Sequence, residues 1–296
     1  MLSGLFNIDK PRGVTSHHVV ERVRGITGQQ KVGHAGTLDP LATGVLPVAL
    51  GKATRLVEYL VDAGKAYRAT LVLGATTDTY DREGTITPTE NVVMPSEGEV
   101  EKALGAFRGE IEQLPPMHSA VKVRGRKLYE LAREGTEIER APRHITITRL
   151  DLEAYDPPSM TLYVECSKGT YIRSLAHDLG MALGTGAYLD ALVRTRHGPF
   201  TLESAITLEA LERAFNEGTW RQCLYTLESM LAGWRIYQAT HEEEQAIMQG
   251  KPLHLAPPSA GSPPMMAAKS HTGELLAMLY WDEEKMSWHP KKVFVT

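Results

Sequence analysis

Apolar residues recur along this chain with two different periods, and the two kinds of segment follow one another in no regular order. Lys65–Leu73 and Met160–Ser167 alternate apolar and polar side chains, which is typical of β-strands with one buried face. Val100, Leu104 and Phe107 are spaced for an amphipathic helix instead. Because a regular strand–helix–strand order would favour a parallel sheet, the irregular order predicts an α+β body.

Length and composition point to a globular chain with a large unit and a smaller one. The 296 residues exceed a typical domain, and short alternating runs follow a Pro-, Ser- and Gly-rich stretch at 257–264, so we expect a small all-β unit at the end. No apolar run could cross a bilayer, and no signal-peptide layout follows Met1. Cys166 and Cys223 form no CxxC motif, which argues against a disulfide framework or a cysteine-rich zinc site and indicates a reducing, cytoplasmic location.

Charge is unevenly distributed along the chain. The formal net charge is −4, and residues 202–296 carry 12 acidic against 8 basic side chains, whereas the first 201 residues balance at 24 each. Residues 118–150 hold 8 basic and 4 acidic side chains. Because salt screens charges beyond ~10 Å at about 0.1 M, such a local basic stretch can track phosphates on a neutral body. A solvated basic loop is the alternative.

Polar residues and glycines predict where several helices begin and end. Ser16 is expected to cap a short helix that Gly25 closes, and residues 52–62 are expected to form one helix. Thr170 is expected to cap a helix whose apolar stripe runs from Ile172 to Leu183.

Asp39 is the one carboxylate in the glycine-rich run Gly33–Leu46. Pro40 restricts Asp39 to an extended backbone, so its side chain would be presented rigidly. A carboxylate without an acidic neighbour does not suit a two-metal site or a paired-carboxylate glycosidase. The spacing alone leaves open a simple Asx-turn, in which Asp39 caps local N–H groups.

Five ordered segments of the chain resemble those of a known enzyme family. The run Gly33–Leu46 is similar to the catalytic motif of the TruB family, the bacterial tRNA pseudouridine(55) synthases, which isomerise a uridine in the T-loop of tRNA. The other matching segments are Asn7–Gly13, Lys65–Ala69, Cys166–Leu175 and Leu192–Thr195.

The resemblance implies a pseudouridine-synthase fold in residues 1–230, with a mixed, largely antiparallel central sheet flanked by helices and loops. Within it, residues 117–143 are expected to form an RNA-gripping insertion. Residues 236–296 resemble a PUA-type RNA-binding module, through Gly250–Leu253 and Trp288–Phe294, and are expected to approach the acceptor end of tRNA.

By the same resemblance, Asp39 is the essential carboxylate, which must be ionised to act as nucleophile or base. Arg173 would pair with it, since opposite charges ~4 Å apart attract by about 4 kcal/mol at an effective dielectric of ~20, and this opposes the cost of burial. Tyr67 would stack on the target base and assist proton removal from C5, and Leu192 would pack under the base. Without the resemblance, these three residues suit a surface arginine, a core tyrosine and a core leucine.

A stacked T-loop base must be extruded before it can react. His34 would fill the vacated space, although a lone histidine also suits a structural role. Asp81 would contact the flipped nucleotides or, alternatively, cap its own turn. The basic stretch would grip RNA through His118, Lys122, Arg124, Arg126 and Lys127.

The implied isomerisation neither oxidises nor hydrolyses its substrate, so no metal or cofactor is expected. The partner would be tRNA, without a membrane or an obligate protein partner. Two other functions remain open: a tRNA-binding or folding chaperone whose catalysis is secondary, and an RNA-guided pseudouridine synthase that depends on proteins and a guide RNA.

Overall fold

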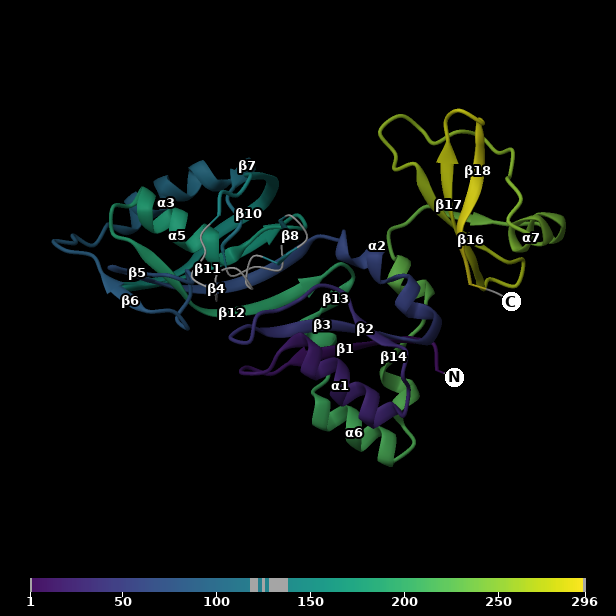
Figure 1. Ribbon diagram of the computed structural model, residues 1–296, viewed down its shortest axis with the longest axis horizontal. Helices are drawn as coiled ribbons and strands as arrows, with labels where there is room; N and C mark the ends of the chain where they lie inside the picture. Colours follow the sequence, from purple (N-terminus) through teal and green to yellow (C-terminus); the bar gives the residue numbers. More distant parts are fainter. Residues whose placement is uncertain (1, 118–121, 124–125, 128–137, 295–296) are drawn as a thin grey trace.

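The computed structural model describes residues 2–117, 122–123, 126–127 and 138–294. Most of these residues build a 10-stranded sheet flanked by helices, and a separate 4-stranded sheet lies at the C-terminal end of the chain (Figure 1). This is the α+β architecture that the sequence predicts. None of the helices in the described ranges is both long and apolar enough to span a bilayer.

The strand order of the large sheet is β14-β1-β3-β12-β4-β11-β10-β7, with β13 added to β12 and β2 to β3. Among the described strands of this sheet, β3 and β12 pair in parallel and the other pairs are antiparallel, so the sheet is mixed and largely antiparallel as expected. Its strands are β1 (Gly4–Lys10), β2 (Val32–His34), β3 (Thr43–Leu50), β4 (Lys65–Leu73), β7 (Gly109–Gln113), β10 (Arg143–Asp156), β11 (Ser159–Cys166), β12 (Ala187–His197), β13 (Phe200–Thr201) and β14 (Leu224–Tyr225).

The predicted alternation of β4 and β11 is confirmed. In β4, Tyr67, Ala69 and Leu71 are buried, whereas Arg68 between them is exposed. In β11, every second residue is buried. The buried faces of these strands contribute to one large hydrophobic core, which explains why their register is fixed.

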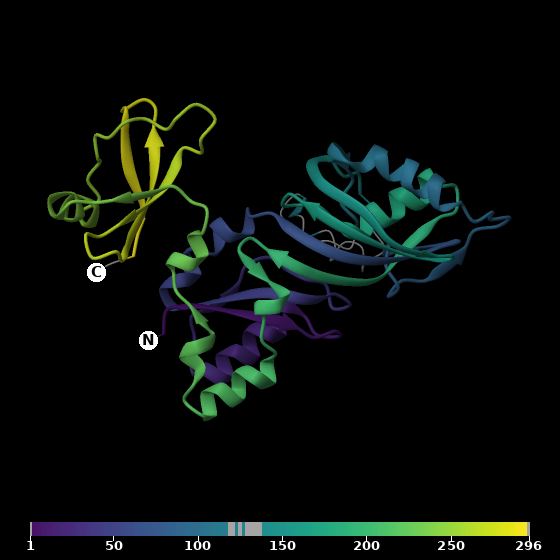
Figure 2. The same cartoon turned by 180° about the vertical axis from the view of Figure 1, so that it is seen from behind.

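Helices cover the two ends of the large sheet (Figures 1 and 2). Helices α1 (Ser16–Thr27) and α6 (Leu208–Asn216) pack together near β1. Helices α3 (Glu97–Leu104) and α5 (Ile172–Ala182) also contact each other, with α3 beside β10 and α5 against β12. The remaining short elements are α2 (Val57–Val61), the strand pairs β5 (Ala75–Thr77) with β6 (Ile86–Pro88) and β8 (Lys122–Val123) with β9 (Arg126–Lys127), and the 3-10 turns η1 (Gly51–Arg55), η2 (Gly105–Phe107), η3 (Leu202–Ser204), η4 (Trp220–Cys223) and η5 (Glu228–Leu231).

The predicted ends of helix α1 are wrong. Thr15, not Ser16, caps the helix by accepting a hydrogen bond from the His18 N–H. The helix continues through Gly25 and ends at Gly28, whose φ of 66° is the left-handed conformation that glycine adopts without strain. Ser16 does not cap the helix, because its hydroxyl bonds to the backbone of Leu38 in a different loop.

Two further helix predictions are corrected. The helix expected over residues 52–62 is a 3-10 turn, η1, followed by the short helix α2. Thr170 does not cap α5, because its hydroxyl donates to the carbonyl of Ser167. At the start of α5, the side-chain oxygen of Gln113 in β7 instead accepts a hydrogen bond from the N–H of Tyr171, the residue that precedes the helix (2.7 Å).

The small sheet has the order β15-β16-β17-β18 and matches the expected PUA-like β unit, with one helix, α7 (His241–Met248), beside it. Its strands are β15 (Ile236–Gln238), β16 (Met265–Lys269), β17 (Leu275–Asp282) and β18 (Ser287–Val293).

The small sheet packs against η1 and α2 of the main body. Arg55 Nη1 donates to the carbonyl of Val293 (2.5 Å), and Lys292 Nζ donates to the carbonyl of Arg55 (2.9 Å) and pairs with Glu58 (3.1 Å). Phe294 belongs to a buried cluster that draws members from both parts, including Leu5, Ala53, Leu56, Ala267 and Met278. The two sheets therefore share a hydrophobic core.

Candidate active site

Asp39 lies in the loop between β2 and β3, and buried contacts fix the residues on both sides of it. Ser16 Oγ donates to the carbonyl of Leu38 (3.0 Å) and accepts from the N–H of the same residue (2.8 Å). The carbonyl of Pro40 accepts from the Gly13 N–H (2.8 Å). These hydrogen bonds fix the backbone on both sides of Asp39, as the restriction by Pro40 predicts.

Arg173 is brought to Asp39 by the first turn of α5. Its Nε lies 3.1 Å from Asp39 Oδ2, and its Nη1 lies 3.3 Å from Asp81 Oδ2 and 3.4 Å from the carbonyl of Thr79. Only 7% of the arginine side chain is exposed. One buried guanidinium thus pairs with two carboxylates that are far apart in the sequence.

Asp81 caps its own turn as well as facing Arg173. Its Oδ1 accepts from the Thr79 hydroxyl (2.7 Å) and from the Glu83 N–H (3.0 Å). With 4% of its side chain exposed, this carboxylate is covered by protein. Asp81 therefore caps its own turn behind Arg173, and its expected contact with flipped nucleotides stays a prediction.

Asp39 differs from Asp81 in that 38% of its side chain is exposed. Burial raises the pKa of Asp39 above its ordinary value. The positive charges of Arg173 and Lys10 lower this pKa, whereas the negative charge of Asp81 raises it further. The carboxylate is accessible to a substrate, and its neighbours set how readily it ionises.

Lys10 lies beneath the same loop, and the structure gives it a structural position. Its side chain is fully buried, and Nζ donates to the carbonyls of Val14 (2.7 Å) and Pro11 (2.9 Å). Burial lowers the pKa of Lys10 to about 8, against the opposing attraction of Asp39. Its donors are engaged by backbone, so it supports the loop from below.

Tyr67 and Leu192 come from the neighbouring strands β4 and β12. Tyr67 lies opposite Arg194 in the strand register, and Leu192 lies opposite Ala69. Tyr67 and Leu192 are each 7% exposed and belong to the large core. Burial raises the pKa of Tyr67 to about 12, although its hydrogen bond with Arg194 opposes the rise, so the phenol stays protonated at neutral pH.

Arg194 connects Tyr67 to the Asp39 loop, a role that is not among the predictions from the sequence. Its Nε donates to the carbonyl of Val45 (2.7 Å) and its Nη2 to that of Gly36 (3.1 Å), and the residue is 1% exposed. A signal existed in the sequence, because the alternation of β12 puts Arg194 on the same buried face as Leu192. An arginine on a buried strand face requires acceptors nearby.

The backbones of β3 and β12 approach closely beside this arginine. Gly44 has a φ of +95°, and a Cβ at this position would lie 2.3 Å from the carbonyl oxygen of Arg194. Only glycine fits there, for reasons of both conformation and space.

The RNA-binding candidates are only partly described. His34, at the end of β2, is half-buried, and burial lowers its pKa, with Arg194 and His17 adding to the effect, so its ring is neutral at pH 7. Lys122, Arg126 and Lys127 lie in the β8–β9 hairpin, whose backbone alone is described. His118 and Arg124 lie outside the described residues.

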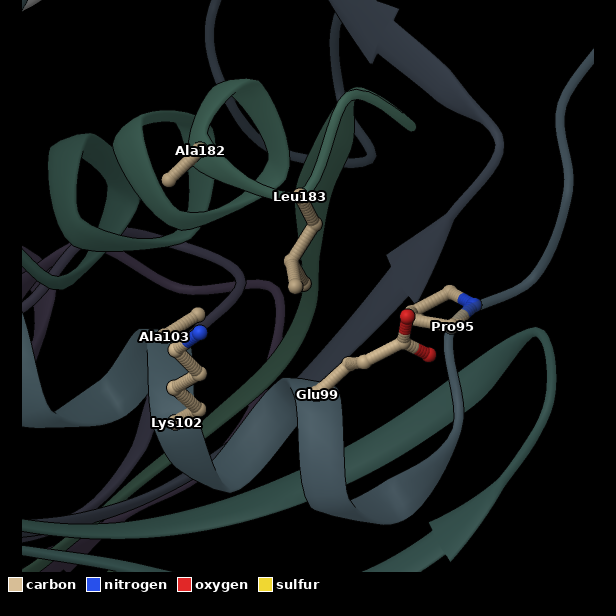
Figure 3. Close-up of a pocket in the computed structure, with 6 residues that line it drawn as sticks. All are labelled: Pro95, Glu99, Lys102, Ala103, Ala182 and Leu183. Atoms are coloured by element: carbon tan, nitrogen blue, oxygen red, sulfur yellow. The ribbon is translucent and has the colours of Figure 1, made fainter.

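A pocket of about 360 Å³ lies away from these residues, between α3 and α5 (Figure 3). It is lined by Pro95, Glu99, Lys102, Ala103, Ala182 and Leu183. At a rise of about 1.5 Å per residue, Ala182 at the end of α5 is about 14 Å along the axis from Arg173. The pocket is therefore separate from the Asp39 site.

Comparisons with known proteins identify the family of this chain. Residues 24–172 match the TruB family pseudouridylate synthase N-terminal domain, and residues 173–232 match the tRNA pseudouridylate synthase B C-terminal domain. The tRNA pseudouridine synthase B of Pseudomonas paraeruginosa is 45% identical over 280 residues, which cover 94% of this chain and 91% of the relative. That of Dehalococcoides mccartyi is 44% identical over 295 residues, which cover 100% and 97%.

Solved structures match the fold of this chain at lower sequence identity. A crystal structure of a Cbf5-Nop10-Gar1 complex matches with a TM-score of 0.78 at 31% identity, over 99% of this chain and 85% of that chain. An H/ACA ribonucleoprotein bound to a substrate RNA containing 2′-deoxyuridine matches with a TM-score of 0.76 at 28% identity, over the same shares. The extent and identity of these matches show that the chain belongs to the TruB family of pseudouridylate synthases.

Proposed function

We propose that this protein converts a uridine to pseudouridine in the T-loop of tRNA, at position 55, with Asp39 as the essential carboxylate. The relatives that are 44–45% identical over nearly the whole chain carry the name tRNA pseudouridine synthase B, which supports tRNA as the substrate. The observation that carries the proposal is a partly exposed carboxylate held by a buried arginine.

The reaction is an isomerisation that balances without any added group. The N1–C1′ bond of the uridine breaks, the uracil turns over, and a C5–C1′ bond forms, while C5 loses a proton and N1 gains one. Asp39 must be ionised to act on the sugar or the ring. Arg173 favours that form by its charge and leaves part of the carboxylate free to react.

Tyr67 and Leu192 are proposed to receive the uracil ring. Tyr67 offers an aromatic face, and because its pKa of about 12 keeps the phenol protonated, its hydroxyl acts as a hydrogen-bond donor or a proton relay. Leu192 supplies an apolar contact from the adjacent strand. Arg194 joins Tyr67 to the loop of Asp39 and so fixes the spacing between base and carboxylate.

The target base is proposed to leave the T-loop stack before it reacts, because a stacked base cannot reach a recessed carboxylate. His34, with a neutral ring near the site, suits the space that the base vacates. The basic hairpin that includes Lys122, Arg126 and Lys127 is proposed to contact the RNA backbone.

The proposal is tested with Asp39→Asn. We expect no detectable pseudouridine in a T-stem-loop RNA, with RNA affinity within a few fold of the unmodified protein, because the amide keeps the shape and loses the charge. Asp190→Asn serves as the control, since Asp190 pairs with Arg82 (3.1 Å) where both are partly exposed. Substantial turnover by the Asp39 variant would refute the mechanism.

The same assay separates the two other functions. A bare T-stem-loop with purified protein should be modified without a guide RNA or another protein, whereas an RNA-guided enzyme would leave it unchanged. A chaperone whose catalysis is secondary would retain its RNA-annealing activity in the Asp39→Asn variant.

A further inference from the structure

A cluster of two histidines and a glutamate lies in the C-terminal unit, far from Asp39 in the sequence and not used by the proposed reaction. His241 and Glu244 are both in the first turn of α7, and a separation of three residues puts them on one face of the helix. His271 lies in the turn between β16 and β17. The ligand atoms of the three side chains all lie within 4.8 Å of one another.

Glu244 is the buried member and already binds the turn. Its side chain is 10% exposed, its Oε1 lies 2.6 Å from His271 Nδ1, and the same oxygen accepts from the His271 N–H. These two residues alone would form a simple side-chain pair, without any need for His241. His241, however, is exposed and places its ring 5.9 Å from that of His271, at 79°. This third donor group makes the cluster more than a pair.

The two segments that carry the cluster, the start of α7 and the β16–β17 turn, are each fixed by their own hydrogen bonds. On the helix side, Thr240 and Glu243 form a capping box, which engages Glu243 and leaves Glu244 to face the turn. On the other side, Ser270 Oγ accepts from the Glu274 N–H (2.9 Å) and bonds to Thr272 Oγ1 (2.7 Å). The cluster therefore rests on two fixed pieces of backbone, as a preorganised ligand set requires.

We propose that His241, Glu244 and His271 bind a divalent transition-metal ion, best fitted by Zn²⁺. Two imidazoles and one carboxylate are a common zinc ligand set, with water in the fourth position of a tetrahedron. Ligands at about 2.1 Å from zinc lie about 3.4 Å apart, a distance that rotation of the exposed histidines can reach from the present spacing. Imidazole ligands favour Zn²⁺ over Mg²⁺ or Ca²⁺, which prefer oxygen.

The bound ion would join the first turn of α7 to the β16–β17 turn and so brace the C-terminal unit. This role does not conflict with a metal-free isomerisation, because the ion would not touch the reacting atoms. The positive end of the helix opposes a cation, and the three acidic residues of the first turn, Glu242, Glu243 and Glu244, counter it.

The test uses the full chain without an affinity tag, stripped with chelator and titrated with Zn²⁺ by calorimetry in the absence of RNA. We expect one Zn²⁺ per chain, a higher melting temperature with Zn²⁺, and no comparable binding of Mg²⁺. His241→Ala should weaken Zn²⁺ binding at least tenfold and remove the melting shift. Because His241 is exposed and lies outside the Glu244–His271 pair, this variant should fold normally.

The matched control is His254→Ala, which removes another exposed histidine of the same unit and should leave Zn²⁺ binding unchanged. Visible absorption of the Co²⁺-substituted protein should show tetrahedral coordination that His241→Ala abolishes. Unchanged zinc affinity in His241→Ala, an equal loss in His254→Ala, or no stoichiometric binding at all would each overturn the proposal. Pseudouridine formation is not measured in this experiment, so its outcome is independent of the proposed function.

Discussion

The loop of Asp39 and the turn of Asp81 present the same chemical group to the same arginine, but only one of them leaves it accessible. In the turn, the carboxylate of Asp81 is covered and accepts from Thr79 and Glu83 as well as from Arg173. In the loop, Asp39 is more than a third exposed and is held through its backbone neighbours instead. Fixing the backbone of a residue leaves its side-chain oxygens available for chemistry, whereas fixing the oxygens does not.

The two carboxylates also differ in their electrostatic effect. The charge of Asp81 raises the pKa of Asp39, and that of Arg173 lowers it. An arginine that faced Asp39 alone would lower the pKa further and make the carboxylate a weaker base. If Asp39 is the essential carboxylate, Asp81 would let Arg173 orient it without making it too weak a base.

The largest effect beyond loss of Asp39 itself is expected from Arg173→Lys. An ammonium is a single point of charge and cannot contact both carboxylates as the planar guanidinium does. We expect kcat/KM for pseudouridine formation to fall roughly 10²-fold, measured on a T-stem-loop RNA. Arg196→Lys is the control, because Arg196 pairs with Glu165 (2.7 Å) at a partly exposed site. If Arg173→Lys is as active as this control, the shared arginine is not what distinguishes the two carboxylates.

Asp81→Asn should have a smaller effect, mainly on stability. An amide nitrogen in place of Oδ2 would face Arg173 Nη1, which is also a donor, so the free energy of unfolding should drop by about 1–3 kcal/mol in urea denaturation.

The same variant should shift the pH dependence in a defined direction. In the unmodified protein, activity should fall as the pH drops through an Asp39 pKa above its ordinary value of 3.8. Asp81→Asn removes a charge that raises this pKa, so the acid limb of the kcat/KM profile should move to lower pH. A shift to higher pH, or none, would contradict the coupling between the two carboxylates.

For Ser16→Ala, which loosens the loop without touching the carboxylate, we expect a smaller effect on activity than for Arg173→Lys and a loss of stability similar to that of Asp81→Asn. The variant leaves the N–H and the carbonyl of Leu38 without their Ser16 partner, so we expect stability to fall by about 1–3 kcal/mol and kcat to fall measurably. Thr15→Ala, one residue earlier, removes only the helix cap and should cost about 1 kcal/mol at unchanged kcat. Equal effects of the two variants on kcat would show that Ser16 does not position Asp39.

These residues also show what sequence reasoning can and cannot reach. Alternation identified β4 and β11, because burial on one face of a strand leaves a local pattern. A serine at the start of a helix has the local option of capping it, so the sequence favours that role for Ser16, and only the folded chain reveals its partner at Leu38. The alternation of β12 indicates that Arg194 is buried, but its acceptors are far from it in sequence, so only the folded chain shows which groups it joins.

The two sheets are separate in the sequence, but the buried cluster packs side chains from both of them together. A shorter version of this chain that ended before Ile236 would bring Leu5, Ala53 and Leu56 closer to water, since some of their companions in that cluster would be gone. Such a truncated enzyme would be prone to aggregation unless polar residues replaced these side chains, so the terminal module cannot be gained or lost without changes elsewhere in the protein.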